Sequence, residues 1–342
     1  MTTFARPVTT ARPHPRIAGV IAVPTTPAAP DPAPDPALPA DLTVGDRFDR
    51  TIPRALVHRA AVSEVLVTDL EDTGADTFLV AAQWPRDHGF YRLRTGDHDP
   101  VLFAETLRQA TLLVAHQGYG VPLDWKFLTH SKSYRVRGDR LAVGPRPADV
   151  LLVVRCRDVK RTPRGVRGMV LEVDGYRGRE WIGSGSVTWS CVAPAGYARL
   201  RGAALAQPAA AGLPVPVPSW SVGRDRDHDV ALGRSTGPRT WPLRVDRDHA
   251  VLFDHPVDHV PGMVLLEAAR QAALLVLGTP DALPLALGMD FDKFVELTGP
   301  AVITAEPLPA PRARRVDARV RFRIEQSDQV VASGEVDLAV RA

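Results

Sequence analysis

Two segments of the chain carry the same three polar side chains in the pattern Glu-x-x-Arg-Gln. The pattern is formed by Glu105, Arg108 and Gln109, and again by Glu267, Arg270 and Gln271. On an α-helix these positions fall within an arc of about 100°, so the three side chains share one face. A carboxylate removed from water beside a guanidinium has the ingredients of a general acid or base, and the arginine can hold that charge or bind an anionic substrate. The Glu and Arg residues are therefore candidate catalytic residues, and the two glutamines are candidate substrate-binding residues.

The residues around the second pattern favour a buried helix. Thirteen of the sixteen residues from Met263 to Gly278 are apolar or glycine, which is typical of a helix that is buried on most sides. Pro261 lies where a first helical turn tolerates proline, and Gly278 is a typical helix stop. An ion pair on a solvated helix face is the common alternative meaning of Glu-x-x-Arg. The apolar neighbours instead favour a polar cluster that faces a pocket.

The start of this helix is a second candidate for chemistry. The first N–H groups of a helix have no partner within the helix and can stabilise an oxyanion. Gly262 would let a thioester approach these groups closely, which makes it a substrate-binding candidate. The first copy has Val101 at the corresponding position, so the two sites are not equivalent.

The histidines near both motifs fall into three groups. His88 and His249, each in an Arg-Asp-His sequence, are predicted to be turn or capping residues rather than catalysts. His98 and His259 lie just before the helices, where a substrate-binding role and a structural role are equally supported. His255 occurs only in the second copy, so a pocket role for it has no support from the repeat. These residues form no metal-ligand pattern, and we expect neither a metal nor another cofactor.

The motifs belong to a longer internal repeat. The sequence Arg86-Asp87-His88 returns 161 residues later as Arg247-Asp248-His249, while the Glu-x-x-Arg-Gln pattern returns after 162 residues. Hydrophobic periodicity gives each copy an N-terminal strand, a loop with an Asp-His pair, a long helix and then a run of strands. The sequence thus predicts two copies of one α+β unit.

Composition marks the limits of the two units. Seven prolines lie between Pro24 and Pro39, so residues 1–43 are expected to be loosely ordered. An Ala-, Gly- and Pro-rich stretch within residues 201–219 is the expected linker. The first unit is then residues 44–200 and the second is residues 220–342.

The overall composition narrows the function classes. The chain of 342 residues is 45% hydrophobic, and its 42 basic and 39 acidic residues give a formal net charge of only +3. A nucleic-acid partner is therefore not expected. Cys156 and Cys191 lack the spacing of a disulfide framework or a zinc site and are expected to be ordinary buried thiols. No membrane-spanning or signal segment is recognisable, so we expect no membrane association and a cytoplasmic location.

Two stretches of the chain carry a resemblance to a known family. The segment from Phe253 to Ala272, FDHPVDHVPGMVLLEAARQA, and its partner from Asp97 to Ala110, DHDPVLFAETLRQA, are similar to the A-factor biosynthesis (AfsA-type) family. The resemblance covers about residues 50–342. It implies a tandem hot-dog fold, in which each repeat wraps a long helix in a curved antiparallel sheet and the two repeats pair as a pseudo-dimer. A monomer and a homodimer both remain open.

The resemblance also implies an activity. The family transfers a β-ketoacyl group from an acyl carrier protein to the hydroxyl of dihydroxyacetone phosphate, the first step towards γ-butyrolactone signalling molecules. Under this reading Glu267 deprotonates the hydroxyl, the helix start at Gly262 stabilises the thioester oxyanion, and Arg270 binds either the phosphate or the carboxylate network. Glu105 and Arg108 would serve a second half-site. The Pro-Gly-Met sequence favours the second copy as the catalytic one.

Two other functions remain open at this point. A dehydratase or thioesterase of the same fold would use or release water and would not need a phosphate. The related dehydratases place a catalytic histidine eight residues before the proline of Pro-Gly, but that position holds Phe253 here, and His255 fits only with a two-residue gap. A non-catalytic protein that binds an acyl or lactone ligand is the third reading, and the Glu, Arg and Gln present in both copies argue against it.

Overall fold

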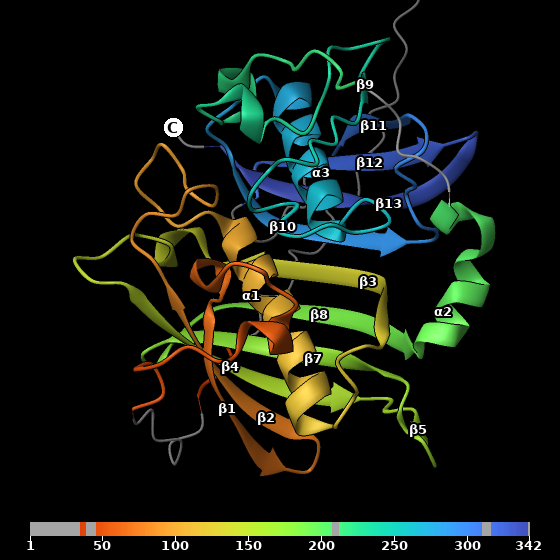
Figure 1. Ribbon diagram of the computed structural model, residues 1–342. Coiled ribbons are helices and arrows are strands. Elements are labelled where there is room, and N and C mark those ends of the chain that lie inside the picture. The colour runs from red at the N-terminus through yellow and green to blue at the C-terminus, as the bar shows by residue number, and fades with distance from the viewer. Residues whose placement is uncertain (1–34, 39–45, 207–211, 310–315, 341–342) are drawn as a thin grey trace, which may run out of the picture. The chain divides into compact units, whose positions relative to one another are not determined.

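The strands form one antiparallel sheet whose order repeats on either side of its centre (Figure 1). The computed structural model describes residues 35–38, 46–206, 212–309 and 316–340, all within one compact unit. The first repeat contributes β1 (Val67–Gly74), β2 (Thr77–Trp84), β3 (Lys126–Val136), β4 (Ala148–Arg157), β7 (Gly168–Arg177) and β8 (Glu180–Val192). The second repeat contributes β9 (Thr240–Pro242), β10 (Leu283–Phe291), β11 (Ala301–Leu308), β12 (Ala318–Gln326) and β13 (Gln329–Ala339). A separate hairpin joins β5 (Arg161–Thr162) to β6 (Gly165–Val166).

The two repeats meet where β3 pairs with β10. Outward from this junction the first repeat continues β8-β7-β4-β2 and the second continues β13-β12-β11-β9, with β1 added at the edge of the first. The same order on both sides is what two copies related by a pseudo-two-fold axis give. The predicted α+β fold of two tandem hot-dog repeats, paired as a pseudo-dimer, is confirmed.

One long helix belongs to each repeat. Helix α1 (Pro100–Leu113) continues through a π-helical turn, η3 (Val114–Gly118), and helix α3 (Gly262–Leu277) ends at Gly278, whose φ of 65° is the left-handed conformation that glycine adopts readily. The helix predicted from Met263 to Gly278 is thus present. Figure 1 shows α1 lying across the strands of the first repeat and α3 across those of the second. Their apolar side chains and the inner faces of the strands form one continuous core.

Shorter helices connect these elements. Five of them, all of 3₁₀ type except α2, bear on the site or the linker: η1 (Arg54–Val57), η2 (Val62–Glu64), α2 (Pro194–Arg201), η6 (Ser219–Val222) and η7 (Asp227–Asp229). Two further 3₁₀ turns are η4 (Gly138–Arg140) and η5 (Gly202–Ala206). No helix in the described ranges is both long enough and apolar enough to cross a membrane.

The segment expected to be a linker packs on the second repeat at both of its described ends. Arg201 is buried at the end of α2, where its guanidinium donates to the carboxylate of Glu296. Val217 is buried, and its N–H donates to the carbonyl of Leu232. Residues 207–211, and most of the expected N-terminal segment 1–43, lie outside the described residues.

The two cysteines behave as predicted. Cys156 on β4 and Cys191 on β8 are buried free thiols, and burial raises the pKa of each to about 11. A thiol with this pKa is almost entirely protonated at neutral pH, so neither is an activated nucleophile.

Candidate functional site

The Glu-Arg-Gln cluster of the second repeat is a closed ionic network. Glu267 is fully buried and accepts from two guanidiniums: Arg224 donates from Nε (3.0 Å) and Nη2 (2.8 Å), and Arg270 donates from Nε (3.0 Å) and Nη2 (2.8 Å). Gln271 adds a fifth hydrogen bond at 2.6 Å. Burial alone would raise the pKa of Glu267, but the two guanidiniums outweigh it and bring the pKa to about 2. Such a carboxylate is held ionised and its oxygens are fully engaged.

The first repeat contains the same network. Glu105 accepts from Arg108 Nε (3.0 Å) and Nη2 (2.9 Å), pairs with Arg59 Nη2 at 2.6 Å, and accepts from Gln109 at 2.7 Å. Burial opposes ionisation of Glu105, yet the two arginines hold its pKa well below the ordinary range. Both networks are therefore built to keep a buried carboxylate charged.

Sequence reasoning missed the two additional arginines. Arg59 follows η1 and Arg224 follows η6, and both end a shared pattern Pro-x-x-x-Val-x-Arg that begins at Pro53 and Pro218. This second repeated motif was the signal that points to them.

These two arginines also join the repeats. Arg59 donates from Nη1 to the carbonyl of Val251 in the second repeat (2.9 Å), and Arg224 donates from Nη1 to the carbonyl of Phe90 in the first (2.6 Å). Each network thus fixes the other repeat's loop against its own helix.

The two glutamines have their polar atoms occupied by the fold. Gln109 accepts from the N–H of Leu66 and donates to the carbonyl of Glu64, besides its bond to the network. Gln271 does the same with Ala231 and Asp229. Their side chains therefore hold the ends of the short helices η2 and η7 and the residues that follow them, which leaves no group to bind a substrate.

A cavity of about 760 Å³ lies between the repeats. Three of the predicted site residues line it: Arg108, Gly262 and His259. Six others are absent from its lining: Glu105, Gln109, His98, Glu267, Arg270 and Gln271. The cavity therefore combines the α1 arginine of the first repeat with the α3 start of the second, while neither carboxylate predicted to be catalytic lines it.

The two arginines of the Glu-x-x-Arg motifs differ in exposure although their motifs are identical. Arg108 is the one residue of α1 that is not buried, with 24% of its side chain exposed, and its Nη1 forms no hydrogen bond within the described part of the chain. Arg270 is only 1% exposed. Only the first repeat's arginine is thus available to a ligand.

The two long helices also start differently. At the start of α1, the Asp99 carboxylate accepts the N–H of Val101 at 2.9 Å, so this end is capped. At the start of α3, Pro261 has ordinary N-cap angles, φ −59° and ψ 141°, but no side chain caps the helix. Gly262 and Met263 line the cavity here. The open helix start predicted for the second copy therefore faces the cavity.

The three histidines near the long helices lie in different surroundings. His259 lines the cavity, and its Nδ1 lies 2.6 Å from Oδ1 of Asp258. His98 is buried with its ring edge against Trp84, and burial lowers its pKa to about 4. His255 lines the cavity mouth and is half exposed beside Asp254.

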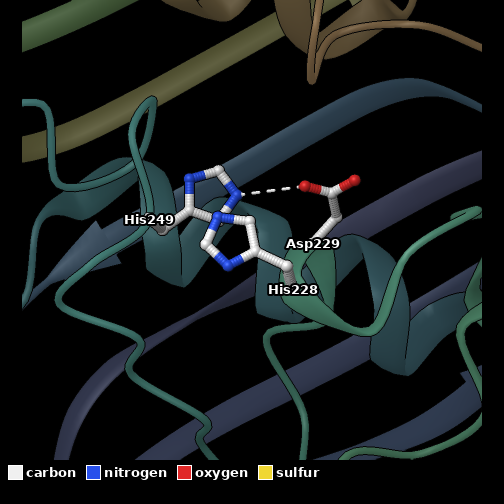
Figure 2. A group of neighbouring side chains, drawn as sticks. All are labelled: His228, Asp229 and His249. Atoms are coloured by element: carbon white, nitrogen blue, oxygen red, sulfur yellow. Dashed lines mark ion pairs between the residues drawn. The ribbon is translucent and has the colours of Figure 1, made fainter.

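His228, Asp229 and His249 form the one group of side chains, among the described residues, whose spacing could suit a metal ion (Figure 2). The Nδ1 of His249 accepts two backbone N–H groups at 3.2 and 3.1 Å, so its neutral ring carries the proton on Nε2. That nitrogen lies 3.3 Å from Asp229 Oδ1 and has no lone pair for a metal. His88 repeats the arrangement with Glu64 at 3.4 Å. Both histidines are turn residues, as predicted.

The amino-acid sequence is similar to those of a known protein family along most of its length. The profile of the A-factor biosynthesis hotdog domain matches residues 41–193 and 205–341. A 2-oxo-3-(phosphooxy)propyl 3-oxoalkanoate synthase from Streptomyces virginiae is 44% identical over 283 residues, covering 83% of this chain and 96% of that protein. Proteins of the same name from Streptomyces coelicolor and Streptomyces griseus are 41% and 37% identical, covering 79% and 78% of this chain and 86% and 88% of their own.

Proposed function

The chain belongs to the A-factor biosynthesis hotdog family, and from this membership we propose that it is a 2-oxo-3-(phosphooxy)propyl 3-oxoalkanoate synthase. The enzyme is an acyltransferase that joins a 3-oxoacyl group to the hydroxyl of dihydroxyacetone phosphate, the first step towards a γ-butyrolactone. We further propose that an acyl carrier protein delivers the acyl group as a thioester and that the reaction takes place in the cytoplasm.

The observation that carries this function is that one cavity holds both an uncapped helix start and a partly exposed guanidinium, Arg108, whose Nη1 has no hydrogen bond among the described residues. The thioester oxygen would lie at the first N–H groups of α3, beside Gly262, where the charge that develops in the transition state is stabilised. The phosphate would lie at Arg108, whose planar fork suits phosphate oxygens. A volume of about 760 Å³ is within the range of small-molecule sites.

The residues named from the sequence then take different roles. We assign Gly262, Arg108 and the rim residue His259 to substrate binding, with one site per chain between the repeats. Glu105 positions Arg108 through two of its nitrogens. Glu267 and Arg270 are assigned to the stability of the fold, and so are the two glutamines and His98.

The proposed reaction predicts a product that needs both substrates. Purified protein incubated with a 3-oxoacyl carrier protein and dihydroxyacetone phosphate is expected to give the phosphorylated 3-oxoacyl ester, or the butenolide formed when it cyclises, by mass spectrometry. Omitting either substrate should abolish this product. Free acid or an enoyl product formed without the phosphate would support a thioesterase or a dehydratase, and no turnover with several chain lengths would support a binding protein.

The proposed phosphate contact predicts a selective loss in the variant Arg108→Leu. Hydrogen bonds to charged groups contribute about 1.5 to 3 kcal/mol, so KM for dihydroxyacetone phosphate should rise about 10- to 100-fold. Unphosphorylated dihydroxyacetone serves as the control substrate, because the variant and the unmodified enzyme should use it equally poorly. An equal loss with both acceptors would place the phosphate elsewhere.

A further inference from the structure

Two lysines line the cavity, Lys132 and Lys293, and the buried one has no place in the roles assigned so far. Lys132, on β3, is buried and lines the cavity. Its Nζ lies 3.9 Å from Sδ of Met263 and forms no ion pair within the described ranges. A buried lysine without an ionic partner is unusual, because burial disfavours the charged form of an amine.

The groups packed around Lys132 favour the neutral form of its amine. Met289 on β10 lies opposite it in the sheet and Met263 on α3 lies above it, and neither titrates. Burial lowers the pKa of Lys132 to about 7, Arg108 and Arg59 lower it too, and only Glu105 acts in the opposite direction. Near neutral pH a large fraction of this lysine is therefore a neutral amine that can accept a proton.

The glutamates and the cavity histidine that the sequence pointed to are engaged. Both buried glutamates are held ionised by two guanidiniums each and lie outside the cavity lining. His259 directs its Nδ1 to Asp258. The proposed acyl transfer still requires a group that removes the proton of the attacking hydroxyl.

We propose that Lys132 is the general base of the acyl transfer, an inference that rests on the proposed function. Its neutral Nζ accepts the hydroxyl proton of dihydroxyacetone phosphate as the hydroxyl oxygen bonds to the thioester carbonyl carbon. The carbonyl electrons move to the oxygen held at the start of α3. When the carbonyl reforms, the C–S bond breaks, and the Lys132 ammonium returns its proton to the departing thiolate.

The position of Lys132 fits this sequence of steps. Met263, which its Nζ contacts, directly follows Gly262 at the helix start. The amine therefore contacts the side chain of a residue in the first turn of α3, and both line the same cavity. Arg108 lines the same cavity. An acceptor whose phosphate it binds would have its hydroxyl in the cavity that Lys132 and the start of α3 line.

A titration that does not depend on turnover tests the basicity of this amine. The chain has only four lysines, Lys126, Lys132, Lys160 and Lys293, so protein labelled at the lysine ε-carbon gives four NMR resonances. One resonance should titrate near pH 7 and be missing in Lys132→Arg. If all four titrate above pH 9, the proposal is overturned whether or not the enzyme turns over.

Kinetics test the catalytic role. Lys132→Met and Lys132→Arg should both lower kcat by about 100- to 10,000-fold with KM for dihydroxyacetone phosphate changed only a few-fold. Lys160→Met, at an exposed lysine, is the control and should retain full activity. A rise in KM that arginine rescues would instead identify a phosphate-binding lysine and overturn the proposal. Circular dichroism checks that each variant is folded, and turnover by the unmodified enzyme tests the proposed function separately.

Discussion

The variant Glu267→Gln is expected to lower the free energy of unfolding by about 3 to 5 kcal/mol, because two buried guanidiniums lose the carboxylate that they share and, among the described residues, only Asp99, 3.5 Å from Arg224, remains as a counter-charge. Arg224 and Arg270 are 3% and 1% exposed, so water cannot replace the lost carboxylate. The same change would remove the tie between α3 and the loop that carries Phe90. Urea unfolding followed by circular dichroism gives this quantity.

Glu105→Gln is the matched variant in the first repeat. Its arginines are less enclosed, since Arg108 is 24% exposed to the cavity, and the loss should be smaller. If Glu267→Gln unfolds like the unmodified protein but has lost activity, the carboxylate is a catalytic base, as the sequence alone suggested, and the structural assignment is wrong.

The same network makes the free energy of unfolding depend on pH in the acidic range. The pKa of Glu267 is about 2 in the fold against an ordinary value near 4.5, so the folded state binds this proton less readily than the unfolded chain. The stabilisation is fully present above pH 4.5 and is lost as the pH falls towards 2. Glu267→Gln should therefore flatten the fall in stability over this range.

Much of the fold follows from local patterns in the sequence. The repeated motifs predicted two equivalent units, and the apolar run after Pro261 predicted the buried helix. The roles of the polar residues do not follow in the same way. From the sequence Glu267 is predicted to face a pocket. In the folded chain its carboxylate is instead bound by Arg224, which lies 43 residues earlier, and no local pattern predicts that contact.

The difference between Arg108 and Arg270 is equally invisible in the sequence, since both arginines stand in the pattern Glu-x-x-Arg-Gln. Only the folded chain shows that the Arg108 side chain is 24% exposed and the Arg270 side chain 1% exposed. Lys132 did leave a signal that was missed. Lys132, Tyr134 and Val136 are every second residue of β3, so their side chains lie on the same face of the sheet. Tyr134 and Val136 are apolar or aromatic and buried, which places the lysine on the inner face as well.

The largest kinetic effect outside Lys132 is expected from Pro261→Asp, which would give α3 the cap that α1 already has. On α1 the Asp99 carboxylate accepts the N–H of the second helical residue, Val101. An aspartate at position 261 would accept the N–H of Met263 in the same way, and its charge would repel the thioester oxyanion. Removing one oxyanion donor lowers kcat by about 100- to 1000-fold in enzymes that use one, and a similar loss is expected here.

The stability of this variant separates the loss from damage to the fold. An N-cap side chain typically adds about 1 kcal/mol to a helix, so Pro261→Asp should melt at an equal or higher temperature while losing activity. Pro261→Ala supplies no side-chain oxygen and should retain most of the activity. Full activity in Pro261→Asp would mean that the Met263 N–H does not hold the thioester oxygen, because the aspartate would occupy that donor.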